Sequence, residues 1–147
     1  MEFSNLVTSF TGKAIRLPFM LTPATAQIRA ALENHQLILD TGADNTALTK
    51  EFLKRSGYGR YHRHGSKKVT ATGEVEMRTC EINGITIANQ LKFGKMKIDV
   101  LENWKSHTVV GVIGMDILSQ MTFLLSHEHK KFLLTNQKIS GLSKLFE

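Results

Sequence analysis

The feature that most constrains the fold is a stretch in which an apolar run leads directly into an acidic turn. Residues 37–46 read Leu-Ile-Leu-Asp-Thr-Gly-Ala-Asp-Asn-Thr. The apolar run predicts a buried strand, and Gly42 behind it predicts a sharp turn that can bring backbone close to a ligand. Asp40 would then lie at the end of a rigid core strand, where catalytic groups are often placed. The alternative is a strand that ends in an ordinary Asp-Thr-Gly turn.

A second motif further along the chain favours the catalytic interpretation of Asp40 over the ordinary turn. Residues 112–120 read Val-Ile-Gly-Met-Asp-Ile-Leu-Ser-Gln. Together the two stretches resemble the two signatures of the retropepsin-like aspartic proteases, of bacterial or mobile-element type, over roughly residues 24–134. The resemblance implies a mostly β, closed-barrel-like acid-protease domain with one or two short helices, active as a symmetric homodimer.

The chemistry of this family needs two carboxylates that share one proton, because two acids about 3 Å apart cannot both ionise. The ionised acid activates a water, and the protonated acid polarises the scissile carbonyl. The sequence contains one Asp-Thr-Gly, at Asp40. Asp116, in the second motif, lacks the following Thr-Gly and is not expected to be the second acid. A dyad would therefore require Asp40 from each of two chains related by a two-fold axis.

The resemblance also implies roles for other positions. Thr41 would hydrogen-bond across the subunit interface, Gly42 would offer its carbonyl to the substrate main chain, and Asp44 would contact the substrate backbone further away. Gly114 would let the second loop pack beneath the first. Met115 stands where viral members carry an arginine that supports the second acid of the first motif, so Asp44 is expected to find another partner. The predicted site is catalytic Asp40, active-site loop Thr41 and Gly42, and substrate-binding Gly42, Ala43, Asp44, Thr72, Gly73 and Ile113.

Thr72 and Gly73 enter this set through an expected flap. The family carries a hairpin flap between its two signatures, and residues 70–73, Thr-Ala-Thr-Gly, fall where the tip would lie. Small residues allow close approach to a peptide and the mobility of a lid. A plain β-turn is the alternative. The polar residues 57–68 before it are expected to form a loop.

The remaining patterns predict many short strands separated by turns, which is typical of a mostly β domain. Pro18 favours an edge position, Asn83-Gly84 is a strong hairpin signal, and Thr49 is a candidate helix cap. Strands are expected over residues 14–21, 26–32, 36–39, 74–82, 95–100, 109–113, 121–125 and 131–135, and helices over 46–56 and 115–120.

The chain length suits one domain with a proper core. We expect an N-terminal extension or edge strand over residues 1–23, the retropepsin-like domain over 24–135, and a tail over 136–147 that could contact the partner subunit. Within the extension, residues 3–10 could form a short amphipathic helix or a strand that pairs with a partner chain.

Composition bounds the compartment and the partners. The single cysteine, Cys80, allows no internal disulfide, the apolar runs are too short for a bilayer, and no signal-peptide pattern opens the chain. These features favour a cytoplasmic protein. Residues 50–68 carry seven Lys or Arg and one acid, so that their local charge of +6 equals the net charge of the whole chain. This basic block could meet nucleic acid, or it could be a solvated surface.

Other chemistries have weaker support. The pairs His62/His64 and His127/His129 would need further ligands to bind zinc, and Cys80 has no identifiable base. We therefore predict an aspartic endopeptidase, a hydrolase that cuts a peptide or protein substrate without metal or cofactor. The first alternative is a non-catalytic dimerisation or peptide-binding module of the same fold. The second is a nucleic-acid-associated protein that uses residues 50–68.

Overall fold

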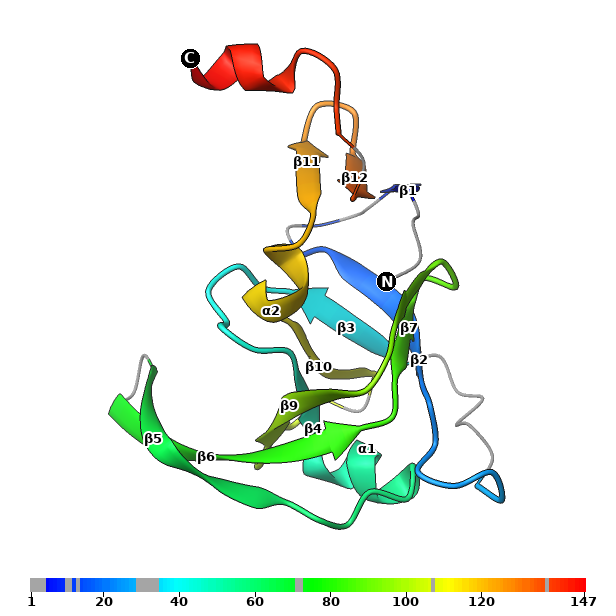
Figure 1. Cartoon of the computed structure of the whole chain (residues 1–147), viewed down its shortest axis with the longest axis vertical. Helices are drawn as coiled ribbons and strands as arrows, with labels where there is room; N and C mark the ends of the chain where they lie inside the picture. The colour runs from blue at the N-terminus through cyan, green and yellow to red at the C-terminus, as the bar shows by residue number, and fades with distance from the viewer. Residues whose placement is uncertain are drawn as a thin grey trace.

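A large sheet, bent around an apolar core, forms the main body of the molecule (Figure 1). The computed structural model describes residues 5–9, 12, 14–28, 35–70, 73–106, 108–136 and 138–147. Within these ranges it has a mostly β fold with two short α-helices and a 3-10 helix. The strands are β1 (Asn5–Ser9), β2 (Arg16–Leu21), β3 (Gln36–Leu39), β4 (Ala47–Thr49), β5 (His62–Thr70), β6 (Gly73–Ile82), β7 (Ile85–Ile87), β8 (Leu91–Phe93), β9 (Met96–Leu101), β10 (Val109–Ile113), β11 (Thr122–Ser126) and β12 (Lys131–Thr135), and the helices are α1 (Lys50–Arg55), α2 (Met115–Leu118) and η1 (Leu142–Phe146).

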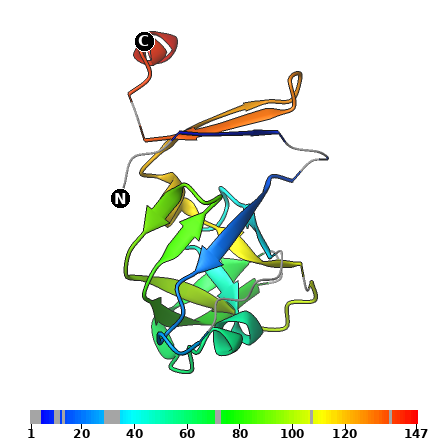
Figure 2. The same ribbon diagram turned by 90° about the vertical axis from the view of Figure 1, so that its right-hand side faces the viewer.

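The strands form two sheets. The larger runs in the order β5-β6-β9-β4-β10-β3-β2-β7-β8, and the smaller runs β1-β12-β11. In the larger sheet β10 lies parallel to β3 and β4 lies parallel to β9. The smaller sheet stands as a layer beyond one end of the main body, with η1 further out (Figure 2). α2 connects the two sheets, because it lies between β10 and β11 in the chain.

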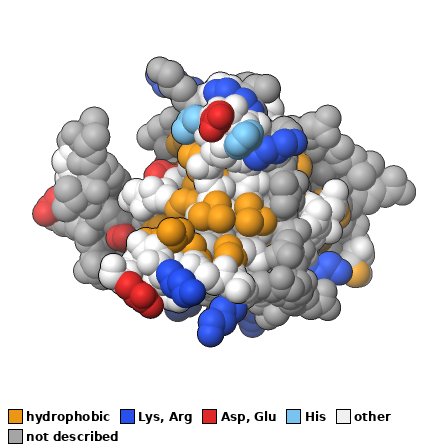
Figure 3. Space-filling model, turned by 90° about the horizontal axis from the view of Figure 1, so that it is seen from above, with side chains coloured by type: hydrophobic (Ala, Val, Ile, Leu, Met, Phe, Trp, Pro, Cys, Tyr) orange, Lys and Arg blue, Asp and Glu red, His pale blue; other side chains and the backbone are white. Residues whose placement is uncertain are grey.

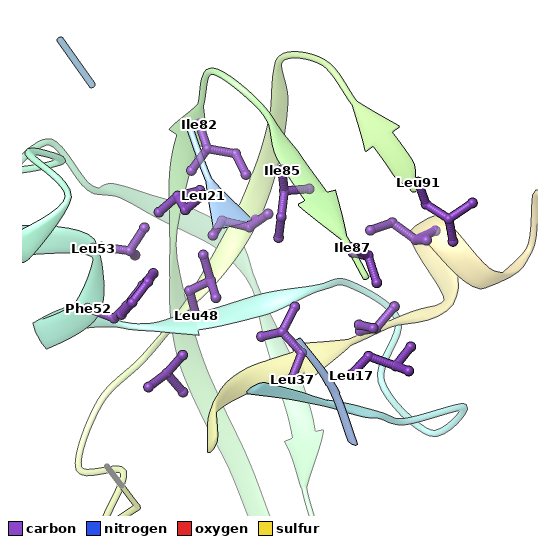
Figure 4. Packing of buried hydrophobic residues seen from close by; sticks show 14 of the residues in the cluster. Leu17, Leu21, Leu37, Leu48, Phe52, Leu53, Ile82, Ile85, Ile87 and Leu91 are labelled. Carbon is purple, nitrogen blue, oxygen red and sulfur yellow. The ribbon is translucent and has the colours of Figure 1, made fainter. Parts of the chain in front are cut away.

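The core lies inside the bend of the larger sheet. Leu37 of β3, Leu48 of β4 and Ile113 of β10 are fully buried there, and these three strands are adjacent. Figure 4 shows Leu37 and Leu48 facing side chains from other strands, among them Leu17 and Ile85. Such burial gives about 1.5–3 kcal/mol for each large aliphatic side chain. The strand that leads to Asp40, β3, also lies between β10 and β2, so that both of its edges are paired.

Strands with a strong apolar pattern follow their predicted positions. Those expected over residues 36–39, 74–82, 95–100, 109–113, 121–125 and 131–135 are confirmed to within one or two residues. Ile98 and Val100 of β9 are buried, Met96 is half-buried, and Asp99 is buried as well. β9 lies between β6 and β4, so that both of its edges are paired.

Two predictions in the N-terminal half are wrong. Residues 26–28 form a turn and a bend instead of a strand, and residues 29–34 lie outside the described ranges. Pro18 is not on an edge, because β2 lies between β3 and β7. The strand changes partner directly after Pro18: residues 16–18 pair with β3, and residues 19–21 pair with β7. A missing amide donor costs little where one ladder ends and the next begins.

Asn83-Gly84 forms a corner and not the predicted hairpin. β6 pairs with β9, whereas β7 pairs with β2 and β8. The usual two-residue hairpin turn needs positive φ at both central positions, and neither Asn83 nor Gly84 has it. The Gly84 carbonyl instead accepts the Thr22 amide at 2.9 Å. The hairpin comes one strand later, between β7 and β8, where Ala88 and Asn89 have φ of 53° and 59°.

Two other elements differ from their predicted bounds because their residues pair as strands. The helix expected over residues 46–56 is shorter, because residues 47–49 pair as β4; the Thr49 cap is confirmed by the Phe52 amide, which donates to Oγ1 at 3.2 Å. Residues 62–68, expected as loop, belong to β5, a polar sequence that an edge strand tolerates.

Each end of the chain forms a regular element. β1 is a strand, but it pairs with β12 of the same chain. The tail carries the 3-10 helix η1, and its Leu145 and Phe146 are 77% and 82% exposed. Among the described residues, no helix has the length and apolarity needed to cross a membrane.

Candidate active site

Asp40 is the first residue after β3, and the neighbouring strands hold its backbone. Its amide donates to the Ile113 carbonyl of β10 at 3.0 Å, and the Leu39 amide before it donates to the Ile15 carbonyl at 3.0 Å. The Asp40 side chain is half-buried. The parallel pairing of β3 and β10 thus positions the acid where the sheet ends.

The Asp-Thr-Gly turn orients the carboxylate. The Gly42 amide donates to Asp40 Oδ1 at 2.9 Å, and the Ala43 amide donates to the Asp40 carbonyl at 3.2 Å. Hydrogen bonds to an ionised acceptor are among the stronger ones. A Cβ at Gly42 would lie 3.2 Å from the same Oδ1. Glycine therefore keeps the amide close to the acid that it orients.

The second motif packs directly beneath this loop, as the resemblance implied for Gly114. A Cβ on Gly114 would lie 2.4 Å from the Asn45 carbonyl carbon. Next in the chain, the Met115 amide donates to the Ala43 carbonyl at 2.7 Å, and the Asp116 amide donates to the Asp44 carbonyl at 3.0 Å. The start of α2 is therefore hydrogen-bonded to the far side of the Asp40 loop.

Asp116 fastens the two loops together, a role that the sequence did not reveal. Its Oδ2 accepts the Thr46 amide at 2.9 Å, and its Oδ1 accepts the Thr46 hydroxyl at 2.8 Å. The Thr46 hydroxyl in turn accepts the Gly114 amide at 3.1 Å. Thr46 is fully buried. The one signal available was an acid in the first turn of a helix, which suits the positive end of the helix dipole.

The other predicted site residues lie in or next to the Asp40 loop. Thr41, Gly42 and Asp44 are exposed on the single chain, and Ala43 is half-buried. The Ile113 side chain is fully buried beneath the loop, so its predicted contact with substrate stays a prediction.

The predicted flap position coincides with a hairpin. β5 and β6 pair antiparallel, with Thr70 opposite Gly73. Gly73 is exposed, at φ 123°, whereas Thr72 lies outside the described residues. In Figure 1 this hairpin and the loop after β3 extend toward the same side of the molecule. A hairpin at this position is confirmed; its function as a flap stays a prediction.

The other titratable candidates lie elsewhere. His62 and His64 are in β5, and His127 and His129 are in the turn between β11 and β12. The described ranges contain no group of three or more His, Cys, Asp or Glu placed to hold a metal ion. Burial, and secondarily the charge of Glu81, raises the pKa of the Cys80 thiol.

Comparison with known proteins shows which families and structures this chain resembles. The family model described as "gag-polyprotein putative aspartyl protease" matches residues 25–120, which include both motifs. A retropepsin-like aspartic protease from Rickettsia conorii has a similar structure, with a TM-score of 0.57 and 18% identity over 90% of this chain and 91% of that one. EIAV protease in complex with the inhibitor HBY-793 gives a TM-score of 0.40 and 22% identity over 73% of this chain and 85% of that one.

None of the curated protein sequences matches this chain. The likeness to the Rickettsia conorii structure supports the retropepsin-like fold, and the family model spans more than half of the chain. This chain therefore belongs to the family of gag-polyprotein aspartyl proteases.

Proposed function

We propose that the chain is an aspartic endopeptidase whose catalytic dyad consists of two Asp40 residues, one from each subunit of a homodimer. The observation that carries the proposal is the fixed setting of Asp40. Its backbone is bonded to β10, and its carboxylate accepts the Gly42 amide. Preorganised groups of this kind need no rearrangement when charge develops in the reaction.

The state of Asp116 supports a dyad made by two chains. Both of its carboxylate oxygens accept hydrogen bonds from Thr46, and Oδ1 also accepts the Ile117 amide at 2.8 Å. An acid that holds two loops together cannot also lie beside Asp40 and share its proton. The acid that completes the dyad is therefore the Asp40 of a second copy.

In the dimer, the two carboxylates would share one proton, and the pair would titrate as a unit. The ionised carboxylate would take a proton from water as that water attacks the scissile carbonyl, and the protonated carboxylate would donate to the carbonyl oxygen. The peptide would lie extended between the Asp40 loops and the β5–β6 hairpins. This mechanism uses neither a metal nor a cofactor.

The smaller sheet offers the surface for the second copy. β11 is an edge strand, paired with β12 on one side, and its Leu124 and Leu125 are each 45% exposed. Figure 3 shows hydrophobic side chains gathered on this end of the molecule. An uncharged apolar edge is a ready template for pairing with another chain. Because β11 follows α2, an interface there would be connected to the loop that carries Asp40.

The test is cleavage of a diverse peptide mixture from acid to neutral pH by wild type and Asp40→Asn, read by mass spectrometry. We expect cuts with the wild type and none with the variant, because the amide cannot act as a base. Glu128→Gln, at an 87% exposed side chain, is the matched control and should cut like the wild type. Folded, dimeric wild type without cuts at any pH would refute the peptidase and favour the peptide-binding module.

A further inference from the structure

The β5–β6 hairpin consists of a supported root and an unsupported arm. Residues 78–82 of β6 pair with β9 on one side. Beyond them, residues 67–70 of β5 and 73–76 of β6 pair with each other, and we call this segment the arm. A two-stranded hairpin is only marginally stable alone. The position of the arm therefore depends on how its root is held.

The strand pairing changes at the root. From Arg63 to Lys67, β5 advances four positions, while from Arg78 to Glu76, β6 advances two. Extra residues in one strand bend the ladder and increase its twist. Arg78 is also the last residue of β6, toward the tip, that pairs with β9. The arm therefore leaves the body of the molecule at Arg78.

The Arg78 side chain ties this point to two loops. Its guanidinium forms an ion pair with Glu102, in the loop after β9. It also lies 5.5 Å from the centre of the Tyr61 ring, in the loop before β5. The Tyr61 hydroxyl donates to the Tyr58 carbonyl at 2.8 Å. Glu102 lies 3.6 Å from Lys50 Nζ at the start of α1. One side chain thus connects the root of the arm to both flanking loops.

We propose that Arg78 is a positioning residue that sets the angle at which the arm leaves the body and, through it, how the arm covers a peptide at Asp40. The second half of this inference rests on the proposed peptidase function. The ion pair is half-exposed, with side chains 31% and 47% accessible. It is therefore screened by solvent and can open without disturbing the core.

The contacts also explain why arginine suits this position. A planar guanidinium can stack on an aromatic ring while its nitrogens bind a carboxylate. Lysine would keep the charge but lose the planar stacking. Arg78→Met should therefore loosen the arm most, because it removes both contacts of the guanidinium. Arg78→Lys and Glu102→Gln should each loosen it less, because each keeps part of the arrangement.

The first measurement is hydrogen exchange of the arm amides, compared with those of residues 96–101 in β9. In Arg78→Met we expect arm exchange about fivefold faster, since weak contacts of the ion-pair and cation–π kind are lost, with β9 unchanged. Arg60→Met, which removes an exposed arginine from the loop before β5, should leave both unchanged. Glu102→Gln tests the same link without altering a strand. Unchanged arm exchange in both Arg78→Met and Glu102→Gln, or equal acceleration in Arg60→Met, would overturn the proposal.

The second measurement uses a peptide that the wild type cleaves. A loosened arm should raise KM several-fold while kcat falls less, because the carboxylates are untouched and the cover over the peptide is weakened. Equal KM in wild type and Arg78→Met would overturn the link from the root to the substrate. If the wild type cleaves nothing, the proposed function fails, and hydrogen exchange still decides whether Arg78 holds the arm.

Discussion

At the scale of single residues, Gly114 has little freedom to change. A Cβ there would meet three backbone atoms of Asn45 and Thr46 at 2.4–2.8 Å. This backbone cannot move aside easily, because hydrogen bonds join its loop to the second motif. We expect Gly114→Ala to lower the free energy of unfolding by about 2–4 kcal/mol, as overpacking does. Gly59→Ala is the control, since a Cβ there meets nothing within 4 Å. Urea denaturation measures both, and equal stability of the two variants would show that the loops can separate at low cost.

Asp116 gives a second prediction at this scale. Asp116→Ala would leave the buried Thr46 amide and hydroxyl without their acceptor, which costs about 1–3 kcal/mol. Asp116→Asn keeps one acceptor oxygen and should cost less. Peptide cleavage should fall in the same order, because the Asp40 loop loses its anchor. A double-mutant cycle with Thr46→Val measures the coupling, and additive losses would contradict the bond between the two side chains.

The site shows what sequence reasoning can reach at the residue scale. Asp40 was predictable because its setting is local: a strand, a turn and a glycine within a few positions. The Asp116–Thr46 bonds join residues 70 positions apart, and the pairing of β10 with β3 and β4 brings them together. A local pattern therefore identified the catalytic candidate but not the residue that fixes its loop.

At the scale of elements, the same distinction separates correct predictions from wrong ones. β9 and β10 were predictable because their apolar side chains carry the period of a buried strand, and Thr49 caps α1 within a single turn. Asn83-Gly84 was misread because its outcome depends on the partners that β6 and β7 choose elsewhere. β5 was misread because an outer strand of a two-stranded arm needs no apolar face.

The packing of the loop at residues 57–61 against β6 predicts a loss of stability at alkaline pH. Burial raises the pKa values of Cys80, Tyr58 and Tyr61 above their ordinary values of 9.0, 10.0 and 10.0. The folded state thus keeps these groups neutral at a pH where the unfolded chain ionises. Their stabilising contribution is present below these ordinary values and is lost as pH rises through the raised ones.

We therefore expect the free energy of unfolding to fall as pH rises above about 9, with Cys80 acting first. Urea denaturation at a series of pH values measures the fall. Cys80→Ala should be less stable at neutral pH, because it leaves a cavity, but its decline should begin at higher pH. A decline with the same onset in Cys80→Ala and wild type would show that the thiol is not the first group to ionise.

At the scale of the whole molecule, the smaller sheet and the β5–β6 arm lie in different parts of the structure. The smaller sheet lies at one end (Figures 1 and 2), with exposed apolar side chains on β11, and the β5–β6 arm projects from the main body (Figure 1). α2 connects the two sheets, and its first residues are hydrogen-bonded to the Asp40 loop. If two copies meet through the smaller sheets, the contact acts on Asp40 through α2 and the hydrogen bonds from its first residues to the loop. Association and catalysis would then be lost together.

This coupling gives the last prediction. Leu124→Lys places a charge on the apolar edge of β11, which disfavours edge pairing. We expect sedimentation velocity to show a shift from dimer to monomer, and cleavage at equal chain concentration to fall in proportion to the dimer that remains. Met20→Lys is the matched control, because Met20 is similarly accessible, at 51%, but belongs to β2 of the larger sheet. Adding Asp40→Asn chains to wild type should also suppress cleavage, since mixed dimers hold one acid. A monomeric wild type that cleaves fully, or a Leu124→Lys dimer with full activity, would show that the dyad is not assembled through β11.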